Sequence, residues 1–238
     1  MNIAIVIPAF KESQNIENLI KSILKALSDP FIVIVDDSPD RKIEEIVSTF
    51  KNIHYIYRGK KLGRGSAVIE GMKTVVKKKE LNIIIEMDAD LSHNPKEILE
   101  NLKIFRKREL DLLISSRYLK ESKIINWSLR RKIFSFLSNK LTKFLLKVPI
   151  TDYTNGFRIY SRKSVEHIIL NCGKIGDGFV ILSEILVELY FNNFKVGETP
   201  SIFKNRIRGE SSVNTKEIFN AFFGLFKIYQ RKKELLKN

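Results

Sequence analysis

The stretch 83–90 reads Ile-Ile-Ile-Glu-Met-Asp-Ala-Asp, an apolar run that ends in two carboxylates, Asp88 and Asp90. A short apolar run is typical of a buried strand, and an open α/β sheet binds its ligands beyond the carboxyl ends of its strands. Mg²⁺ and Mn²⁺ prefer hard oxygen ligands and leave positions for phosphate oxygens. We therefore predict a divalent-metal site at Asp88 and Asp90, where the two carboxylates share the cation or divide between the metal and a ribose. Two solvated aspartates in a turn are the alternative.

Strand-like runs alternate with helix-period segments on both sides of this stretch. Strands are expected at 2–8, 31–35, 53–58, 82–87 and 111–116, and helices at 15–27, 41–50, 64–79 and 95–107. This order predicts an α/β fold in which helices flank a mostly parallel central sheet. The polar loops that follow the first two strands should lie at the same sheet edge as Asp88.

The alternation ends after residue 120. Further helices are expected at 128–147, 162–170, 179–192 and 214–235, with a polar loop at 151–158 and a hairpin at 195–206. The chain contains no repeat, linker or low-complexity segment, so residues 1–238 are predicted to form a single domain.

The net charge of +15 is uneven, with eight Lys/Arg and one acid at 120–147 and five Lys/Arg and one acid at 227–238. A basic surface binds nucleic acid, anionic lipid or phosphorylated substrates. A nucleic-acid-binding protein would explain the charge but not Asp88 and Asp90, and no nucleic-acid-binding module is recognisable. We therefore expect no nucleic-acid partner.

Targeting and redox signals are weak. Cys172 is the only cysteine, so no intrachain disulfide can form, which fits a reducing compartment. The first strand has no basic segment before it and no cleavage site after it, so no signal peptide is expected. The longest uncharged apolar runs, Phe31–Val35 and Phe219–Phe226, are far shorter than the ~20 residues of a membrane span.

The motifs, taken in order over almost the whole chain, resemble those of the family 2 glycosyltransferases and, within them, the dolichol-phosphate mannose synthase group. The matching motifs are Pro8-Ala-Phe-Lys-Glu12, Val35-Asp-Asp-Ser-Pro-Asp40, Gly63-Arg-Gly-Ser-Ala67, Met87-Asp-Ala-Asp-Leu-Ser-His93, Ser115-Ser-Arg-Tyr118, Arg131-x3-Ser135-x3-Asn139, Asp152-x-Thr154-Asn-Gly-Phe-Arg158 and Arg206-x-x-Gly209-Glu-Ser211. Three positions depart from the pattern, namely Phe10-Lys11, Arg41-Lys42 and Asn155.

The resemblance implies a nucleotide-binding fold of the GT-A type, with a donor-binding half (1–120) and an acceptor-binding half (121–238). It implies that the donor is bound by Pro8, Ala9, Phe10, Glu12, Asp36, Asp37 and Asp88. Asp88 and Asp90 would hold Mg²⁺ or Mn²⁺, and Arg206 would reach over the donor diphosphate or the transferring sugar. Arg117, Arg131 and Ser135 would bind the acceptor phosphate. Asp88, Asp90, Arg117 and Arg206 form the predicted catalytic set.

The resemblance further implies inverting transfer of mannose from GDP-mannose to dolichol or another polyprenyl phosphate. A phosphate monoester is largely a dianion at neutral pH, so this acceptor needs cations rather than a general base. Accordingly, His54, His93 and His167 are interpreted as surface or loop residues, and Glu184 as structural. The alternatives are transfer of glucose from UDP-glucose to the same lipid, transfer to a sugar hydroxyl, and an inactive scaffold.

The helix at 128–147 has three faces at about 100° per residue. Arg131, Ser135 and Asn139 share one stripe, and an apolar stripe expected to be buried contains Ile133, Leu137, Leu141, Phe144 and Val148. A third face combines Phe136 with Lys132, Lys140, Lys143 and Lys147, a pattern typical of a helix at a bilayer surface. A solvated basic face with one stray aromatic residue is the alternative. The helix at 214–235 is also amphipathic, and core packing is the alternative for its apolar side. We therefore expect a peripheral protein at the cytoplasmic face of a membrane, with a small membrane-anchoring subunit as a further candidate partner.

Overall fold

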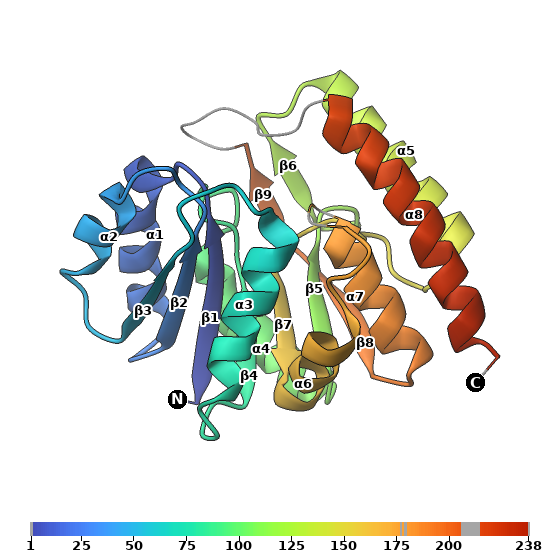
Figure 1. Ribbon diagram of the computed structural model, residues 1–238. Helices are drawn as coiled ribbons and strands as arrows, with labels where there is room; N and C mark the ends of the chain where they lie inside the picture. The colour runs from blue at the N-terminus through green and yellow to red at the C-terminus, as the bar shows by residue number, and fades with distance from the viewer. Residues whose placement is uncertain (1, 177, 179, 206–214, 238) are drawn as a thin grey trace.

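A computed structural model describes residues 2–176, 178, 180–205 and 215–237, and its first half alternates strands and helices (Figure 1). The elements of this half are β1 (Ile3–Ala9), α1 (Ser13–Ala26), β2 (Phe31–Asp36), α2 (Lys42–Val47), β3 (Ile53–Tyr57), α3 (Arg64–Val76), β4 (Ile83–Glu86), η1 (Pro95–Glu97), α4 (Ile98–Lys107) and β5 (Leu112–Ser116). They agree with the strands and helices expected for residues 2–116.

The second half adds shorter strands and longer helices. Its elements are β6 (Lys123–Ile125), α5 (Leu129–Leu146), β7 (Arg158–Ser161), α6 (Arg162–Asn171), α7 (Val180–Phe191), β8 (Val196–Pro200), β9 (Ile202–Lys204) and α8 (Thr215–Leu235). The central sheet has seven strands in the order β3-β2-β1-β4-β7-β5-β8. All neighbours pair in parallel except β7, which is antiparallel to both β4 and β5. The predicted mostly parallel α/β sheet is therefore confirmed.

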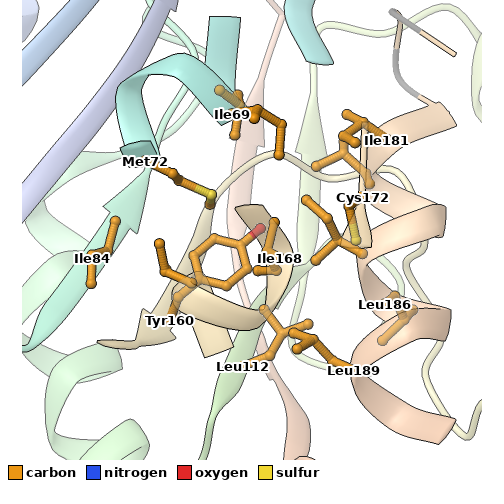
Figure 2. Close-up of a cluster of buried hydrophobic side chains, with 14 of the residues drawn as sticks. Ile69, Met72, Ile84, Leu112, Tyr160, Ile168, Cys172, Ile181, Leu186 and Leu189 are labelled. Carbon is orange, nitrogen blue, oxygen red and sulfur yellow. The ribbon is translucent and has the colours of Figure 1, made fainter. Parts of the chain in front are cut away.

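Helices cover both faces of this sheet. On one face, α1, α2 and α4 pack on alternate residues of β1 and β2, such as Ile5 and Ile34. On the other face, α3, α6 and α7 pack on Val6, Val33 and their neighbours. Figure 2 shows this second cluster, in which Met72 of α3, Tyr160 of β7 and Leu186 of α7 converge. The strands read as continuous apolar runs because both faces are buried.

The hairpin expected at 195–206 is wrong. β8 pairs in parallel with β5, and β9 leaves the central sheet to pair in parallel with β6. The break lies at Ser201, whose N–H donates to the Ser116 carbonyl (3.0 Å). Strands β6 and β7 were not expected from the sequence, because runs of three or four residues carry too little periodicity to identify a strand.

The orientation of α5 also differs from the expectation. Ile133, Leu137, Leu141 and Phe144 were expected to be buried, yet they are 51%, 56%, 48% and 75% exposed. The side that packs on the protein instead contains Asn139, Thr142 and Leu146. A polar contact determines which side of α5 packs inward: the Asn139 side chain accepts from the N–H of Tyr153 at 2.8 Å. Within the helix, the same side chain donates to the Ser135 carbonyl at 2.9 Å.

In Figure 1, α5 and the C-terminal part of α8 run side by side, away from the sheet. Phe223 and Phe226 of α8 are 65% and 59% exposed. We define the apolar surface of these two helices as Leu129, Ile133, Phe134, Leu137, Leu141, Phe144, Phe223 and Phe226. No helix within the described residues is both long and apolar enough to cross a bilayer.

Candidate active site

The predicted donor and metal residues lie at the carboxyl ends of β1, β2 and β4. Strand β1 lies between β2 and β4, with α1 on one face of the sheet and α3 on the other. The strand order therefore reverses at β1, which is where doubly wound sheets bind nucleotides. Residues 8–12 leave β1 at this point, 36–40 leave β2, and 87–93 leave β4.

Asp36 and Asp37 are buried and support the surrounding loops. Asp36 accepts from the Ser38 N–H and the Tyr55 hydroxyl, both at 2.8 Å. Asp37 accepts from Arg58 Nε (2.5 Å) and from the Leu62 and Gly63 N–H groups (2.8 and 3.0 Å). Oδ2 of Asp37 thus fixes the loop that opens α3, and Oδ1 holds Arg58, whose Nη2 donates to the Gly63 carbonyl at 3.2 Å. Gly63 begins that helix with φ +99°, a conformation that favours glycine.

The β1 loop supplies the remaining predicted donor residues. Pro8 and Ala9 end the strand, and Phe10 is half-buried with the ammonium groups of Lys11 and Lys61 at 5.5 and 5.4 Å from its ring centre. Glu12 Oε2 accepts from the Asn15 side chain at 2.6 Å. An aromatic ring flanked by two cations can hold a nucleobase beside the phosphates of the same donor.

Asp88 is held from two sides. Its Oδ1 accepts from Arg64 Nε and Nη2 (2.9 and 2.7 Å), and its N–H donates to His93 Nδ1 (3.1 Å). Burial opposes ionisation of Asp88, but the positive charge of Arg64 outweighs that effect and lowers the pKa of the carboxyl. Asp88 is therefore a carboxylate at neutral pH.

His93 lies in the loop after β4, as expected, but it is not a surface residue. The ring is only 1% exposed and lies between Phe157 and Phe203. Because Nδ1 accepts from Asp88, the proton resides on Nε2, which donates to Asn155 Oδ1 at 2.9 Å. His93 therefore fixes the backbone of Asp88, and Asn155, one of the departures from the family pattern, fixes His93.

Asp90 and Ser92 complete an oxygen-rich wall. Both line one cavity with Asp88, and Asp90 Oδ1 accepts from the Ser92 N–H at 3.0 Å. The Ser92 hydroxyl is buried and has no hydrogen-bond partner among the described residues. Those residues contain no group of three His, Cys, Asp or Glu that could hold a metal. Two carboxylates and a hydroxyl instead suit Mg²⁺ or Mn²⁺ that takes its other ligands from water and substrate phosphates.

Arg117 faces the same cavity and is not a surface residue. Its Nε and Nη2 form a bidentate ion pair with the fully buried Asp152, both at 2.7 Å. Nη2 also donates to Thr154 at 2.7 Å. The fork is thus held rigidly by Asp152 while the guanidinium remains on the cavity wall.

Arg131 lines the cavity from α5 and is exposed. Its guanidinium lies 4.0 Å from the ring centre of Trp127, and Nη1 donates to Asn205 at 3.0 Å. Ser135, one turn further along α5, lies outside the cavity lining and its hydroxyl is 2.6 Å from that of Tyr118. The structure therefore brings together Asp88, Asp90, Arg117 and Arg131, but not Ser135.

Arg206, predicted to reach over the diphosphate, lies outside the described residues, as do Gly209 and Ser211. The sequence reasoning gave no site role to Arg64, Ser92, Trp127, Asp152, Phe203 or Asn205. Arg64, Ser92 and Asp152 stand inside the motifs that carry the family resemblance, so their position was a usable signal. Trp127, Phe203 and Asn205 carried none, because they reach the site from β6, β9 and the adjoining loops.

Such a cavity can separate two charged substrates. Carboxylates and a hydroxyl on one wall suit a metal–diphosphate, and two guanidinium groups on the other suit a second phosphate. Residues 4–169 match Glycosyl transferase family 2. This chain belongs to that family.

Relatives within the family align over most of the chain. A dolichol-phosphate mannosyltransferase of Pyrococcus furiosus is 34% identical over 243 residues, which cover 99% of this chain and 66% of that protein. A polyprenol monophosphomannose synthase of Mycolicibacterium smegmatis is 31% identical over 92% of this chain and 83% of that protein. The chain thus spans about two thirds of the length of the archaeal relative.

A solved structure shares the GT-A fold at low identity. Glucosyl-3-phosphoglycerate synthase of Mycobacterium tuberculosis, solved with Mn²⁺, UDP-glucose and phosphoglyceric acid, superposes with a TM-score of 0.67. The match covers 97% of this chain and 79% of that one at 15% identity. The expected family and fold are therefore confirmed: the chain is a family 2 glycosyltransferase.

Proposed function

We propose that this glycosyltransferase transfers mannose from GDP-mannose to a polyprenyl phosphate, with inversion at the anomeric carbon. One observation carries the proposal: Asp88, Asp90 and Ser92 line the same cavity as Arg117 and Arg131. The names of the two relatives support mannose as the sugar and a polyprenyl phosphate as the acceptor. In this proposal residues 1–120 bind the donor and residues 121–238 bind the acceptor.

The residues divide the chemistry between donor and acceptor. Phe10, Glu12 and Asp37 would position the nucleoside at the ends of β1 and β2. Asp88, Asp90 and Ser92 would hold Mg²⁺ or Mn²⁺. When bound, the metal would stabilise the negative charge that develops on the leaving diphosphate.

Arg117 and Arg131 would hold the acceptor phosphate opposite the donor. The phosphate is a dianion near neutral pH, so one of its oxygens can attack the anomeric carbon without a general base. Attack from the side opposite the departing GDP inverts the configuration of that carbon. Because Asp152 fixes the Arg117 fork, little reorganisation is needed to hold the nucleophile.

The membrane would be contacted through the apolar surface of α5 and α8. Phe144, Leu137 and Phe223 project from these helices, and Lys140, Lys143 and Lys147 lie beside them on α5 or at its end. An exposed apolar stripe next to lysines is typical of a helix that lies in an anionic bilayer surface. Arg131 is on the same helix, so docking would bring the acceptor site to the lipid headgroups. We place this surface at the cytoplasmic face of the membrane.

An assay with a panel of nucleotide sugars tests the proposed reaction. Purified protein is incubated with GDP-mannose, UDP-glucose or GDP-glucose and a short polyprenyl phosphate, and the lipid product is measured. We expect transfer with GDP-mannose in the presence of Mg²⁺ or Mn²⁺. Transfer from UDP-glucose alone would overturn the donor assignment, and transfer to a free sugar alone would overturn the acceptor assignment.

A vesicle assay tests the membrane surface. Replacing Lys132, Lys140, Lys143 and Lys147 with Gln should weaken binding to anionic vesicles and slow transfer to long-chain lipid, but spare transfer to a short acceptor. Each lysine near anionic lipid contributes about 1 kcal/mol, and high salt should screen the effect. Equal loss with both acceptors would overturn the membrane role. Unchanged vesicle binding would instead favour a membrane-anchoring subunit.

A further inference from the structure

Arg64, the first residue of α3, extends across the metal site. Its Nε and Nη2 both donate to Asp88 Oδ1, at 2.9 and 2.7 Å. Its Nη1 forms an ion pair with Glu86 Oε1 at 2.6 Å. The side chain is only 11% exposed. One arginine thus bridges the last residue of β4 and the first predicted metal ligand.

Glu86 pairs with this arginine from the end of β4. The carboxyl is fully buried, and its second oxygen accepts from the Tyr160 hydroxyl at 2.7 Å. A buried carboxylate without a cation would be strongly disfavoured, so Glu86 requires the guanidinium. The charges of Asp88 and Glu86 outweigh the effect of burial and raise the pKa of Arg64. Arg64 is therefore a permanent cation.

The surrounding backbone is shaped around this guanidinium. A Cβ on Gly156 would collide with Arg64 Nη2 and would lie 3.0 Å from Asp88 Oδ1. Only glycine fits at that position while Arg64 contacts Asp88. On its other side, the Gly63 N–H is held by Asp37, which we assign to the donor nucleoside. Arg64 therefore connects the donor loop to the metal site.

We propose that Arg64 is a built-in competitor of the divalent metal, and that it makes metal binding depend on the donor. Two cations then share Asp88, and a positive charge beside a carboxylate repels a metal ion. In the absence of donor, Arg64 neutralises Asp88 and metal binding is weak. The diphosphate of the donor supplies the additional negative charge that lets the metal bind while Arg64 stays on Glu86. This inference rests on the proposed metal site at Asp88 and Asp90.

Mn²⁺ binding, measured by the paramagnetic resonance signal of free Mn²⁺ with and without GDP, tests this competition. We expect wild-type protein to bind Mn²⁺ weakly alone and tightly with GDP. Arg64→Gln should strengthen binding in the absence of GDP by roughly tenfold or more, because the competing charge is removed. The gain from adding GDP should shrink accordingly. Arg41→Gln, which removes an exposed arginine of equal charge that pairs with Glu44, is the matched control and should change neither value.

The double variant Arg64→Gln/Glu86→Gln separates local competition from net charge. It removes one positive and one negative charge, and the amide oxygen introduced in place of the Glu86 carboxylate keeps an acceptor for Tyr160. It should still bind Mn²⁺ more tightly than wild type without GDP. Circular dichroism confirms folding of each variant.

Two outcomes would overturn the inference in distinguishable ways. If wild-type protein binds Mn²⁺ only with GDP but Arg64→Gln does not strengthen binding in its absence, Arg64 merely orients Asp88 and the competition is wrong. If wild-type protein binds no Mn²⁺ even with GDP, the metal site itself is wrong and the inference fails with it.

Discussion

The end of β4 and the exposed side of α5 differ in how completely their side chains are paired or buried. At β4, almost every polar group has a partner: Asp88 contacts Arg64 and His93, and Glu86 contacts Arg64 and Tyr160. On α5, by contrast, Phe144 and Leu137 are large apolar side chains that are 75% and 56% exposed. In the first region, hydrogen bonds and ion pairs therefore fix the side chains without any bound substrate. The second leaves large apolar side chains exposed, and we propose that they contact a membrane.

The comparison predicts that substitutions in the two regions fail in different ways. Substitutions at the end of β4 should reduce the rate of sugar transfer without altering membrane binding. Substitutions on the outer side of α5 should reduce membrane binding without altering the rate of transfer to a short polyprenyl phosphate. The predictions below test that separation.

The largest effect is expected at Asp88 and Asp90. Asp88→Asn or Asp90→Asn should reduce transfer roughly a hundred- to thousandfold, because in the proposed mechanism the lost carboxylate would hold the metal that stabilises the leaving diphosphate. Product formation is measured with GDP-mannose and a short polyprenyl phosphate. Chelator should abolish wild-type activity and Mg²⁺ or Mn²⁺ should restore it. Full activity in chelator would contradict metal-assisted transfer.

The two arginines that we propose for the acceptor phosphate, Arg117 and Arg131, should differ in their effect on stability. Arg131→Ala removes an exposed cation, so transfer should fall about ten- to hundredfold through the loss of a charge-assisted contact, with little change in stability. Arg117→Ala should lose comparable activity and also about 3–5 kcal/mol of unfolding free energy, because Asp152 would remain buried and unpaired. Urea denaturation measures the second effect.

GDP binding is the control for both arginine variants. Calorimetry should show donor affinity close to that of wild type. A loss of GDP affinity in proportion to activity would assign the arginine to the donor. The double variant Arg117→Ala/Asp152→Ala should recover part of the stability but none of the activity, which separates the structural role of Arg117 from its contact with phosphate.

The apolar surface of α5 should show the opposite behaviour. Replacing Ile133, Leu137 and Phe144 with Ser should leave the unfolding free energy nearly unchanged, because these side chains are about half exposed or more. Binding to vesicles should fall at least tenfold, since each large apolar side chain contributes about 1.5–3 kcal/mol when fully removed from water. Flotation with vesicles is the measurement. A large loss of stability would show that the protein itself covers this surface.

The sequence predicted the sheet better than it predicted α5, for physical reasons. Strands buried on both faces, such as Ile3–Ala9, are continuous apolar runs and leave little ambiguity. A helix with two apolar or mixed faces does not reveal which of them packs inward. On α5 that choice is made by Asn139, through hydrogen bonds with Tyr153 and Thr154 in a loop 14 and 15 residues away in sequence.

The motif residues of the site were predictable, but their partners were not. Asp88, Asp90, Arg117 and Arg131 stand in motifs, and the fold brings all four to one cavity. The residues that fix them lie far along the chain: Asp152 is 35 residues from Arg117, and Asn155 is 62 residues from His93. No local pattern encodes such pairs. A buried histidine that holds a backbone N–H therefore looks like any loop histidine.

The smallest effect is expected at Glu184 of α7. Its side chain is only 4% exposed, and burial raises its pKa from 4.5 to about 7 although Oε1 accepts from the Gly173 N–H at 3.1 Å. The folded protein therefore keeps a proton that the unfolded chain loses above pH 4.5. The stabilisation linked to this proton is complete below pH 4.5 and is lost as the pH rises to about 7. Melting temperatures between pH 5 and 8 should accordingly fall for wild type and fall less for Glu184→Gln, which stays neutral. The difference between the two proteins isolates Glu184 from its charged neighbours Glu188 and Arg231. Parallel curves would show that other groups stabilise the Glu184 carboxylate in the folded protein.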